Sequence, residues 1–147
     1  MATLDSMWRR LKNIFASLRA YSDLRPDLRM RQRVNRCLRN RPPLSANQWF
    51  EQFWQPQGIN QPIVTFVYTQ MQAYSGLEFA RVRPHDRLNE DLYLTLVCWF
   101  DWETSFNEDF FARFDIDLGD RFDPQNFTTV EELVIFLNHQ LLSVNHS

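Results

Sequence analysis

The sequence predicts a mostly α-helical fold with a basic helical extension at its N-terminus. Apolar side chains recur at intervals of three and four residues in successive segments, as on one face of an α-helix. Proline and glycine stand near the ends of these segments. Hydrophobic residues make up 44% of the 147 residues and aromatic residues 15%, which is enough to fill one core.

Charge divides the chain into two parts. Residues 1–45 carry eleven Lys and Arg against three acids, a net charge of +8, whereas the remainder carries five Arg against fifteen acids, a net charge of −10. We therefore predict a basic amphipathic helical arm at 1–43 and an acidic helical domain at 44–147. Such an arm binds either a partner surface or its own domain, and the charge pattern leaves both open.

Two helices are expected in the arm. The first covers 7–21, and its apolar face is made by Met7, Trp8, Leu11, Ile14, Phe15 and Leu18. Pro26 stops it from continuing. The second covers 27–40 and is rich in arginine. Pro42 and Pro43 then form a linker to the domain.

The first two helices of the domain have clear start and stop signals. Ser45 and Gln48 form a capping box that opens a helix ending before Gly58. The next helix covers 60–75, and Gly76 is placed to end it.

The second half of the domain is predicted to hold one long helix and one terminal helix. Residues 77–91 form an ordered loop with a short strand at 78–82. The longest helical pattern covers 90–114. Its broad apolar face is expected to include Leu92, Leu96, Val97, Phe100, Phe106, Phe110, Phe111 and Phe114. Thr128 or Thr129 caps the last helix, with a glutamate three residues on.

Three short motifs follow one another in the second half of the chain. Asp86-Arg-Leu88-Asn-Glu-Asp91-Leu92 precedes the long helix, Phe114-Asp-Ile116-Asp-Leu118 closes it, and Phe127-Thr-Thr-Val130 opens the last helix. In this order they resemble the acyl carrier protein family, over residues 60–142. The resemblance implies an acyl-carrier-like four-helix bundle. It also implies an acidic second helix that docks onto basic partner surfaces.

The residue that carriers use is missing. The family attaches a phosphopantetheine arm to a serine in an Asp-Ser-Leu motif, and this chain has no such motif. Counting back from Phe114 by the family's spacing reaches Phe100, and the segment is longer than in the family by about four residues, one helical turn. Ser105 lies too close to Phe114. We therefore expect no cofactor, with attachment at a displaced serine such as Ser105 as the alternative.

Two groups of residues are candidates for partner binding. The acidic helix supplies Glu90, Asp91, Asp101, Trp102, Glu103, Glu108 and Asp109. The arm supplies Trp8, Arg9, Arg10, Leu11, Phe15, Arg31, Arg33, Arg36 and Arg39. Trp102 is a candidate for exposure, because exposed tryptophan is typical of binding hot spots, whereas Trp99 is expected mainly in the core.

Nothing in the sequence indicates an active site or a metal site. His85 stands next to Asp86 but has no nucleophile beside it, and Cys37 and Cys98 do not have metal-ligand spacing. The chain has only three glycines and no glycine-rich phosphate loop. We therefore predict no catalytic residues, no metal and no enzyme activity.

The sequence thus predicts a non-catalytic adaptor whose main partner is another protein. An anionic membrane is a second partner for the arm, because its apolar residues lie opposite basic ones. Nucleic acid is disfavoured because the acidic domain would repel it. A small regulatory protein that uses the arm on membrane or nucleic acid remains an alternative. The chain shows no signal-peptide pattern, so we expect a cytoplasmic protein, with peripheral membrane contact left open.

Overall fold

The computed structural model describes residues 25–145. The predicted helix at 7–21 lies outside this range. So do five of the arm's candidate residues, Trp8, Arg9, Arg10, Leu11 and Phe15.

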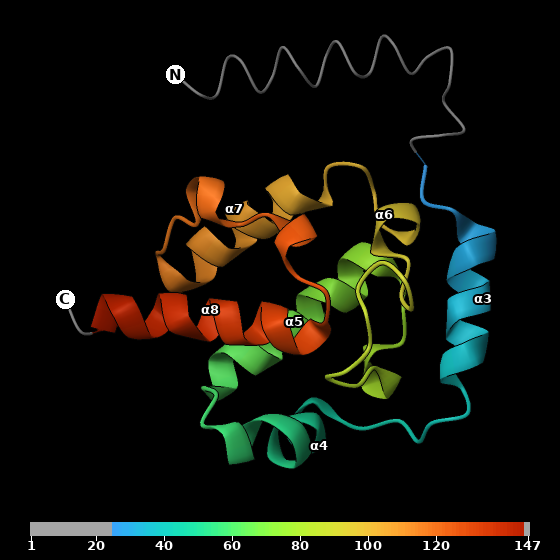
Figure 1. Ribbon diagram of the computed structural model, residues 1–147, viewed down its shortest axis with the longest axis horizontal. Coiled ribbons are helices and arrows are strands. Elements are labelled where there is room, and N and C mark those ends of the chain that lie inside the picture. Colours follow the sequence, from blue (N-terminus) through green and yellow to red (C-terminus); the bar gives the residue numbers. More distant parts are fainter. Residues whose placement is uncertain (1–24, 146–147) are drawn as a thin grey trace, which may run out of the picture.

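The described chain is built from helices joined by loops (Figure 1). In order, the α-helices are α3 (Leu28–Leu38), α4 (Ala46–Trp49), α5 (Gln61–Ser75), α6 (Leu94–Val97), α7 (Trp102–Phe114) and α8 (Val130–Asn145). A π-helical segment (Phe50–Trp54) and a 3₁₀ turn (Gln55–Gln57) continue α4, and further 3₁₀ turns cover Phe79–Arg81, Gly119–Arg121 and Pro124–Asn126. Within 25–145 there is no strand, only an isolated bridge between Arg87 and Thr129. The mostly α prediction is confirmed, and the carrier-like bundle stays a prediction.

Local signals in the sequence set several helix ends. The Asp27 carboxylate accepts the Met30 N–H at 3.0 Å and caps α3. Ser45 and Gln48 form the predicted capping box at the start of α4. Gly76 ends α5 in the left-handed conformation, at a φ of +70°.

Two predicted elements take another form. Residues 78–82 hold a 3₁₀ turn instead of a strand. The long helix predicted at 90–114 is broken between α6 and α7. In a continuous helix the carbonyls of Leu96 and Val97 would accept the N–H groups four residues on. Here Leu96 O accepts the Asp27 N–H at 2.8 Å, and Val97 O accepts Nη2 of Arg31 at 2.8 Å, so residues from α3 take the place of the next helical turn.

The core is centred on α5, which passes through the middle of the molecule (Figure 1). Its Phe66 makes edge-to-face contacts with three phenylalanines of α7, with ring centroids 5.4 to 5.6 Å apart. Tyr68, two residues on, contacts Trp49 of α4 at 5.4 Å. These aromatic contacts join α4, α5 and α7 around one core.

The second predicted helix of the arm packs against the domain. Val34 and Leu38 of α3 are buried in the common core. The Asn35 amide donates to Gly76 O at 3.1 Å and accepts the Glu78 N–H at 2.9 Å. The described part of the arm is therefore continuous with the rest of the fold.

A buried carboxylate joins the linker to two other parts of the chain. Asp86 is 6% exposed and accepts two hydrogen bonds from the Arg41 guanidinium, at 2.6 and 2.8 Å. It also accepts the Arg83 N–H at 2.7 Å. Its backbone carbonyl accepts the Val130 N–H at 3.0 Å, at the start of α8. The linker after α3, the loop before α6 and the last helix thus meet at Asp86.

Substituting Arg41→Ala should destabilise the fold by about 3 kcal/mol, because it leaves the buried Asp86 carboxylate without a counter-charge. Urea unfolding followed by circular dichroism measures this loss. The control is Arg87→Ala, which removes exposed ion pairs with Glu90 and Asp91 and should cost less. An equal loss in the two variants would contradict the role given to Asp86.

A second prediction tests how closely α3 packs. Gly58 and Gly76 both have left-handed φ angles, so alanine at either position should cost about 1 to 2 kcal/mol in backbone strain. A Cβ at Gly76 would also lie 2.6 Å from Cδ of Arg31, whereas nothing lies within 4 Å of one at Gly58. We expect Gly76→Ala to lower the free energy of unfolding more than Gly58→Ala does. An Arg31→Ala background should abolish that difference, and its persistence there would show that α3 is not the cause.

Candidate interaction surfaces

Ion pairing in the described part of the chain is concentrated around the linker and the loop before α6. Arginines of these segments pair with Glu78, Asp86, Glu90 and Asp91. The hydrogen bond from Arg87 lowers the pKa of Asp91. Glu90 and Asp91 were predicted on the acidic helix; they instead lie in the loop before α6 and are engaged by Arg87.

The acids of α7 form no ion pairs within 25–145. Asp101, Glu103, Glu108 and Asp109 are the predicted site residues here, and no arginine or histidine of the described chain lies within 4.0 Å of their carboxylates. Asp109 accepts a hydrogen bond from the Tyr74 hydroxyl. The negative charge of α7 is therefore left largely uncompensated.

Tyr74 and Asp109 connect α5 to α7. Burial, followed by the hydrogen bond to Asp109, raises the pKa of Tyr74 well above its usual range. Tyr74 therefore keeps its proton at physiological pH and serves as a donor. This bond fixes the Asp109 carboxylate on the side of α7 that faces α5.

One outward strip of α7 combines acidic groups with an exposed aromatic ring. Thr104, Glu108, Phe111 and Asp115 follow helical spacing and are all exposed. Phe111 is 51% exposed, although its apolar character predicts a place in the core. The buried stripe of α7 is made by Trp102, Phe106 and Phe110. Phe111 lies about 100° around the helix from Phe110, and therefore outside this stripe. We call the four exposed residues the acidic α7 strip.

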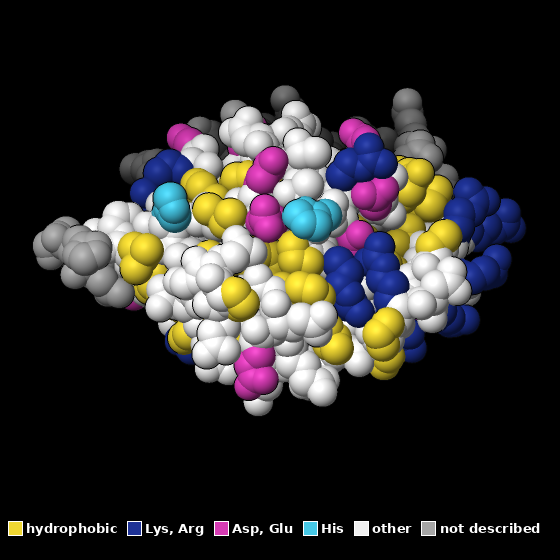
Figure 2. All heavy atoms as spheres, turned by 60° about the horizontal axis from the view of Figure 1, so that its bottom comes forward, with side chains coloured by type: hydrophobic (Ala, Val, Ile, Leu, Met, Phe, Trp, Pro, Cys, Tyr) yellow, Lys and Arg dark blue, Asp and Glu magenta, His cyan; other side chains and the backbone are white. Residues whose placement is uncertain are grey.

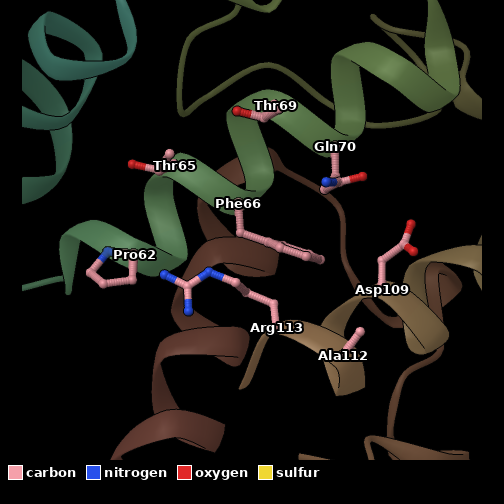
Figure 3. A pocket seen from close by; sticks show the side chains of 8 residues that line it. All are labelled: Pro62, Thr65, Phe66, Thr69, Gln70, Asp109, Ala112 and Arg113. Carbon is pink, nitrogen blue, oxygen red and sulfur yellow. The ribbon is translucent and has the colours of Figure 1, made fainter. Parts of the chain in front are cut away.

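A groove of about 470 Å³ lies between α5 and α7, on the side of α7 that carries Asp109 and Arg113 (Figure 3). It is lined by Pro62, Thr65, Phe66, Thr69, Gln70, Asp109, Ala112 and Arg113. Figure 3 shows Phe66 pointing across from α5 and Arg113 reaching from α7 toward Pro62. The polar groups of the lining are the hydroxyls of Thr65 and Thr69, the Gln70 amide, the Asp109 carboxylate and the Arg113 guanidinium. Its mixture of small, aromatic and charged residues suits contact with a partner.

The two tryptophans beside the helix break exchange their expected places. Trp102 was predicted at the surface for partner binding; it is 6% exposed and packs on Phe106 and Phe122 at ring distances of 6.3 and 6.2 Å. Trp99, expected in the core, is 53% exposed. The cause is the helix break, because α7 begins at Trp102 and Trp99 lies before it, outside the helical register.

A second surface is apolar and lies where α3 meets α6. Eight large hydrophobic residues of the described chain are exposed, and five of them belong to this region. They are Leu28, Tyr93, Leu96, Trp99 and Phe100, which we call the apolar platform. Single exposed apolar residues are normal, but a group of five requires an explanation.

Arginines of α3 flank the apolar platform. Arg29, Arg33 and Arg36 are exposed and form no ion pair within the described residues. Figure 2 shows basic side chains along the right-hand edge of the molecule, where α3 lies in Figure 1, with hydrophobic side chains beside them. The predicted surface positions of Arg33 and Arg36 are thus retained.

The other two predicted arginines of α3 differ from this pair. Arg31 was predicted to contact a partner; it is instead half-buried between Gly76 and the Val97 carbonyl, and it holds α3 in place. Arg39 is 67% exposed at its side chain and lies 4.0 Å from the Glu78 carboxylate.

The remaining reactive groups do not converge on a site. Cys37 is exposed, and Cys98 is buried, which raises the pKa of its thiol to about 12. Ser105 is half-buried on α7. Across 25–145, no three His, Cys, Asp or Glu side chains come together as metal ligands. The described helices are also all too short or too polar to cross a membrane.

No protein-family model matches the sequence, and no curated protein or solved structure shows significant similarity to it. The description of its surfaces therefore depends on the residues themselves.

The uncompensated acids of α7 lead to a prediction about pH. Loss of solvent and the nearby Asp123 carboxylate raise the pKa of Glu103. A raised pKa favours the protonated form in the folded state, so this stability is present below pH 4.5 and is lost as pH rises through the pKa of folded Glu103. Glu103→Gln should therefore raise the free energy of unfolding at pH 7 relative to wild type, with little effect at pH 4.

Urea unfolding at the two pH values tests this. Glu51→Gln, an exposed acid in the π-helical segment, is the control. A Glu103→Gln variant with the same pH dependence as wild type would contradict the raised pKa of Glu103 in the folded state.

Proposed function

We propose that this chain is a non-catalytic adaptor that binds another protein through the acidic α7 strip and the adjoining groove. The single observation that carries the proposal is Phe111, an aromatic side chain 51% exposed between Glu108 and Asp115. Exposed aromatic residues rimmed by charge are typical of binding hot spots. The groove between α5 and α7, lined on α7 by Asp109, Ala112 and Arg113, gives a partner side chain a separate place to enter.

The chemistry of the strip defines the partner. The unpaired carboxylates of α7 favour a basic surface, because opposite charge speeds association and fixes orientation. The exposed ring of Phe111 favours an apolar pocket at the centre of that surface. We therefore expect a partner with an apolar depression surrounded by arginine or lysine.

The resemblance to acyl carrier proteins supports the same assignment. In that family the second helix docks onto basic partners, and α7 occupies the corresponding place in the sequence. The family's spacing places its serine near Phe100 when counted back from Phe114 and near Leu96 when counted forward from Asp91, and neither residue has a hydroxyl group to hold a prosthetic arm. In this proposal the chain retains the docking role of the family without the chemistry.

Site-specific photocrosslinking tests the proposal. A photoreactive phenylalanine at position 111 of the full chain should form a discrete adduct with one protein in cells of the native host. The same group at Leu142, an exposed apolar position on α8, should not. Substituting Phe111→Ser should then weaken binding of the identified partner about 30-fold, as loss of a hot spot of about 2 kcal/mol would.

Two results would contradict the proposal. One is equal crosslinking from positions 111 and 142, since it would mean that the contact is non-specific. The other is a mass gain equal to phosphopantetheine on the intact chain from its native host. That gain would favour the carrier alternative, and a Ser105→Ala variant would locate the attachment.

A further inference from the structure

The apolar platform is a costly feature to leave in water. Leu28 is 60% exposed, Trp99 53%, Leu96 45% and Phe100 42%. They come from the start of α3, from α6 and from the segment that joins α6 to α7. Exposed apolar groups of this size mark an interaction surface in a soluble fold.

The apolar platform and the arginines of α3 form one rigid unit. The Asp27 N–H donates to Leu96 O, and Arg31 donates to Val97 O, so the start of α3 is fixed to α6 at two points. Leu28 directly precedes Arg29 in α3. A surface that covers Leu28 therefore also comes within reach of Arg29, the first arginine of this stripe.

The arginines lie on one outer stripe of α3. Arg29, Arg33 and Arg36 are spaced by four and three residues, so they share a face. The opposite face carries the buried Val34 and Leu38. Like charges so arranged repel each other, and an external anion would relieve the repulsion.

We propose that this face, the apolar platform together with Arg29, Arg33 and Arg36, binds an anionic lipid membrane. Arginine forms forked hydrogen bonds to phosphate, which lipid headgroups supply. Tryptophan, phenylalanine and leucine insert at the boundary between headgroups and acyl chains. The arginines thus match the headgroup phosphates, and the apolar side chains match the start of the acyl chains.

The leucines distinguish a membrane from nucleic acid. Leu28 and Leu96 gain free energy by entering acyl chains, but they have no ring on which a base stacks. The negative charge of the rest of the chain opposes a long polyanion, whereas a membrane contacts one face only. The ribbon of α7 runs away from α3 in Figure 1, so the C-terminal turns of α7 lie apart from the arginines of α3. The membrane proposal does not depend on the proposed protein partner.

A fluorescent label on the apolar platform tests the proposal in the full chain. Leu96→Cys in a Cys37→Ser background carries an environment-sensitive dye; the buried Cys98 has a raised pKa and resists labelling. Vesicles of phosphatidylcholine with phosphatidylglycerol should shift the dye emission to the blue, and vesicles of phosphatidylcholine alone should not. The matched control label is Leu142→Cys, exposed on α8, which should show no shift with either vesicle.

Substitutions then separate the contribution of α3 from that of residues 1–24. Replacing Arg29, Arg33 and Arg36 by glutamine should weaken vesicle binding at least about tenfold, whereas lysine at all three should retain the part of the binding that positive charge alone supplies. Unfolding curves of both variants check that the fold is intact.

Three results would overturn the proposal. The first is vesicle binding with the label at position 96 still in water, because another segment would then make the contact. The second is binding that the glutamine substitutions leave unchanged. The third is binding of single-stranded DNA by this face without binding of anionic vesicles.

Discussion

The capture of two backbone carbonyls by α3 determines most of what is unusual in this molecule. Asp27 and Arg31 bind the carbonyls of Leu96 and Val97, which a continuous helix would use for its next turn. The helix therefore stops and restarts at Trp102. The restart buries Trp102 and exposes Trp99, and the same bonds fix α3 with its arginines outward. These two hydrogen bonds thus determine which residues of α7 are buried, which residues form the apolar platform, and where the arginines of α3 lie.

The acids of the loop before α6 are paired with arginines, whereas the arginines on the outer face of α3 and the acids of α7 are not. Arg41 compensates Asp86, whose burial would make an unpaired charge costly, and Arg87 pairs with the exposed Glu90 and Asp91 of the same loop. Arg29, Arg33 and Arg36 of α3 and the acids of α7 form no ion pairs within 25–145. Both groups lie at the surface, where solvation lowers the cost of leaving them unpaired. This separation leaves exposed charge of opposite sign on α3 and on α7.

The parts of the fold that could be predicted are those with local causes. The helices α3 and α5 are specified by periodicity, and the caps at Ser45 and Gly76 lie within a few residues of the ends they define. The break before α7 was missed because its cause is remote: Arg31 is 66 residues away from Val97. The site predictions follow the same division. Helical spacing placed Glu108 on α7, whereas the exposure of Phe111 and Trp99 depends on the break and could not be found from periodicity.

The helix break bears on the absence of an attachment serine. Four residues, Cys98 to Asp101, separate α6 from α7, and the sequence is longer than the carrier family here by about the same length. A carrier needs an exposed hydroxyl group at the start of a firmly anchored helix. This chain has two exposed aromatic rings at that place, and two hydrogen bonds from α3 hold the preceding turn. Aromatic rings cannot carry a phosphodiester, but they bury large apolar areas on contact. Both proposed functions therefore use these rings and the other exposed side chains as contact surfaces.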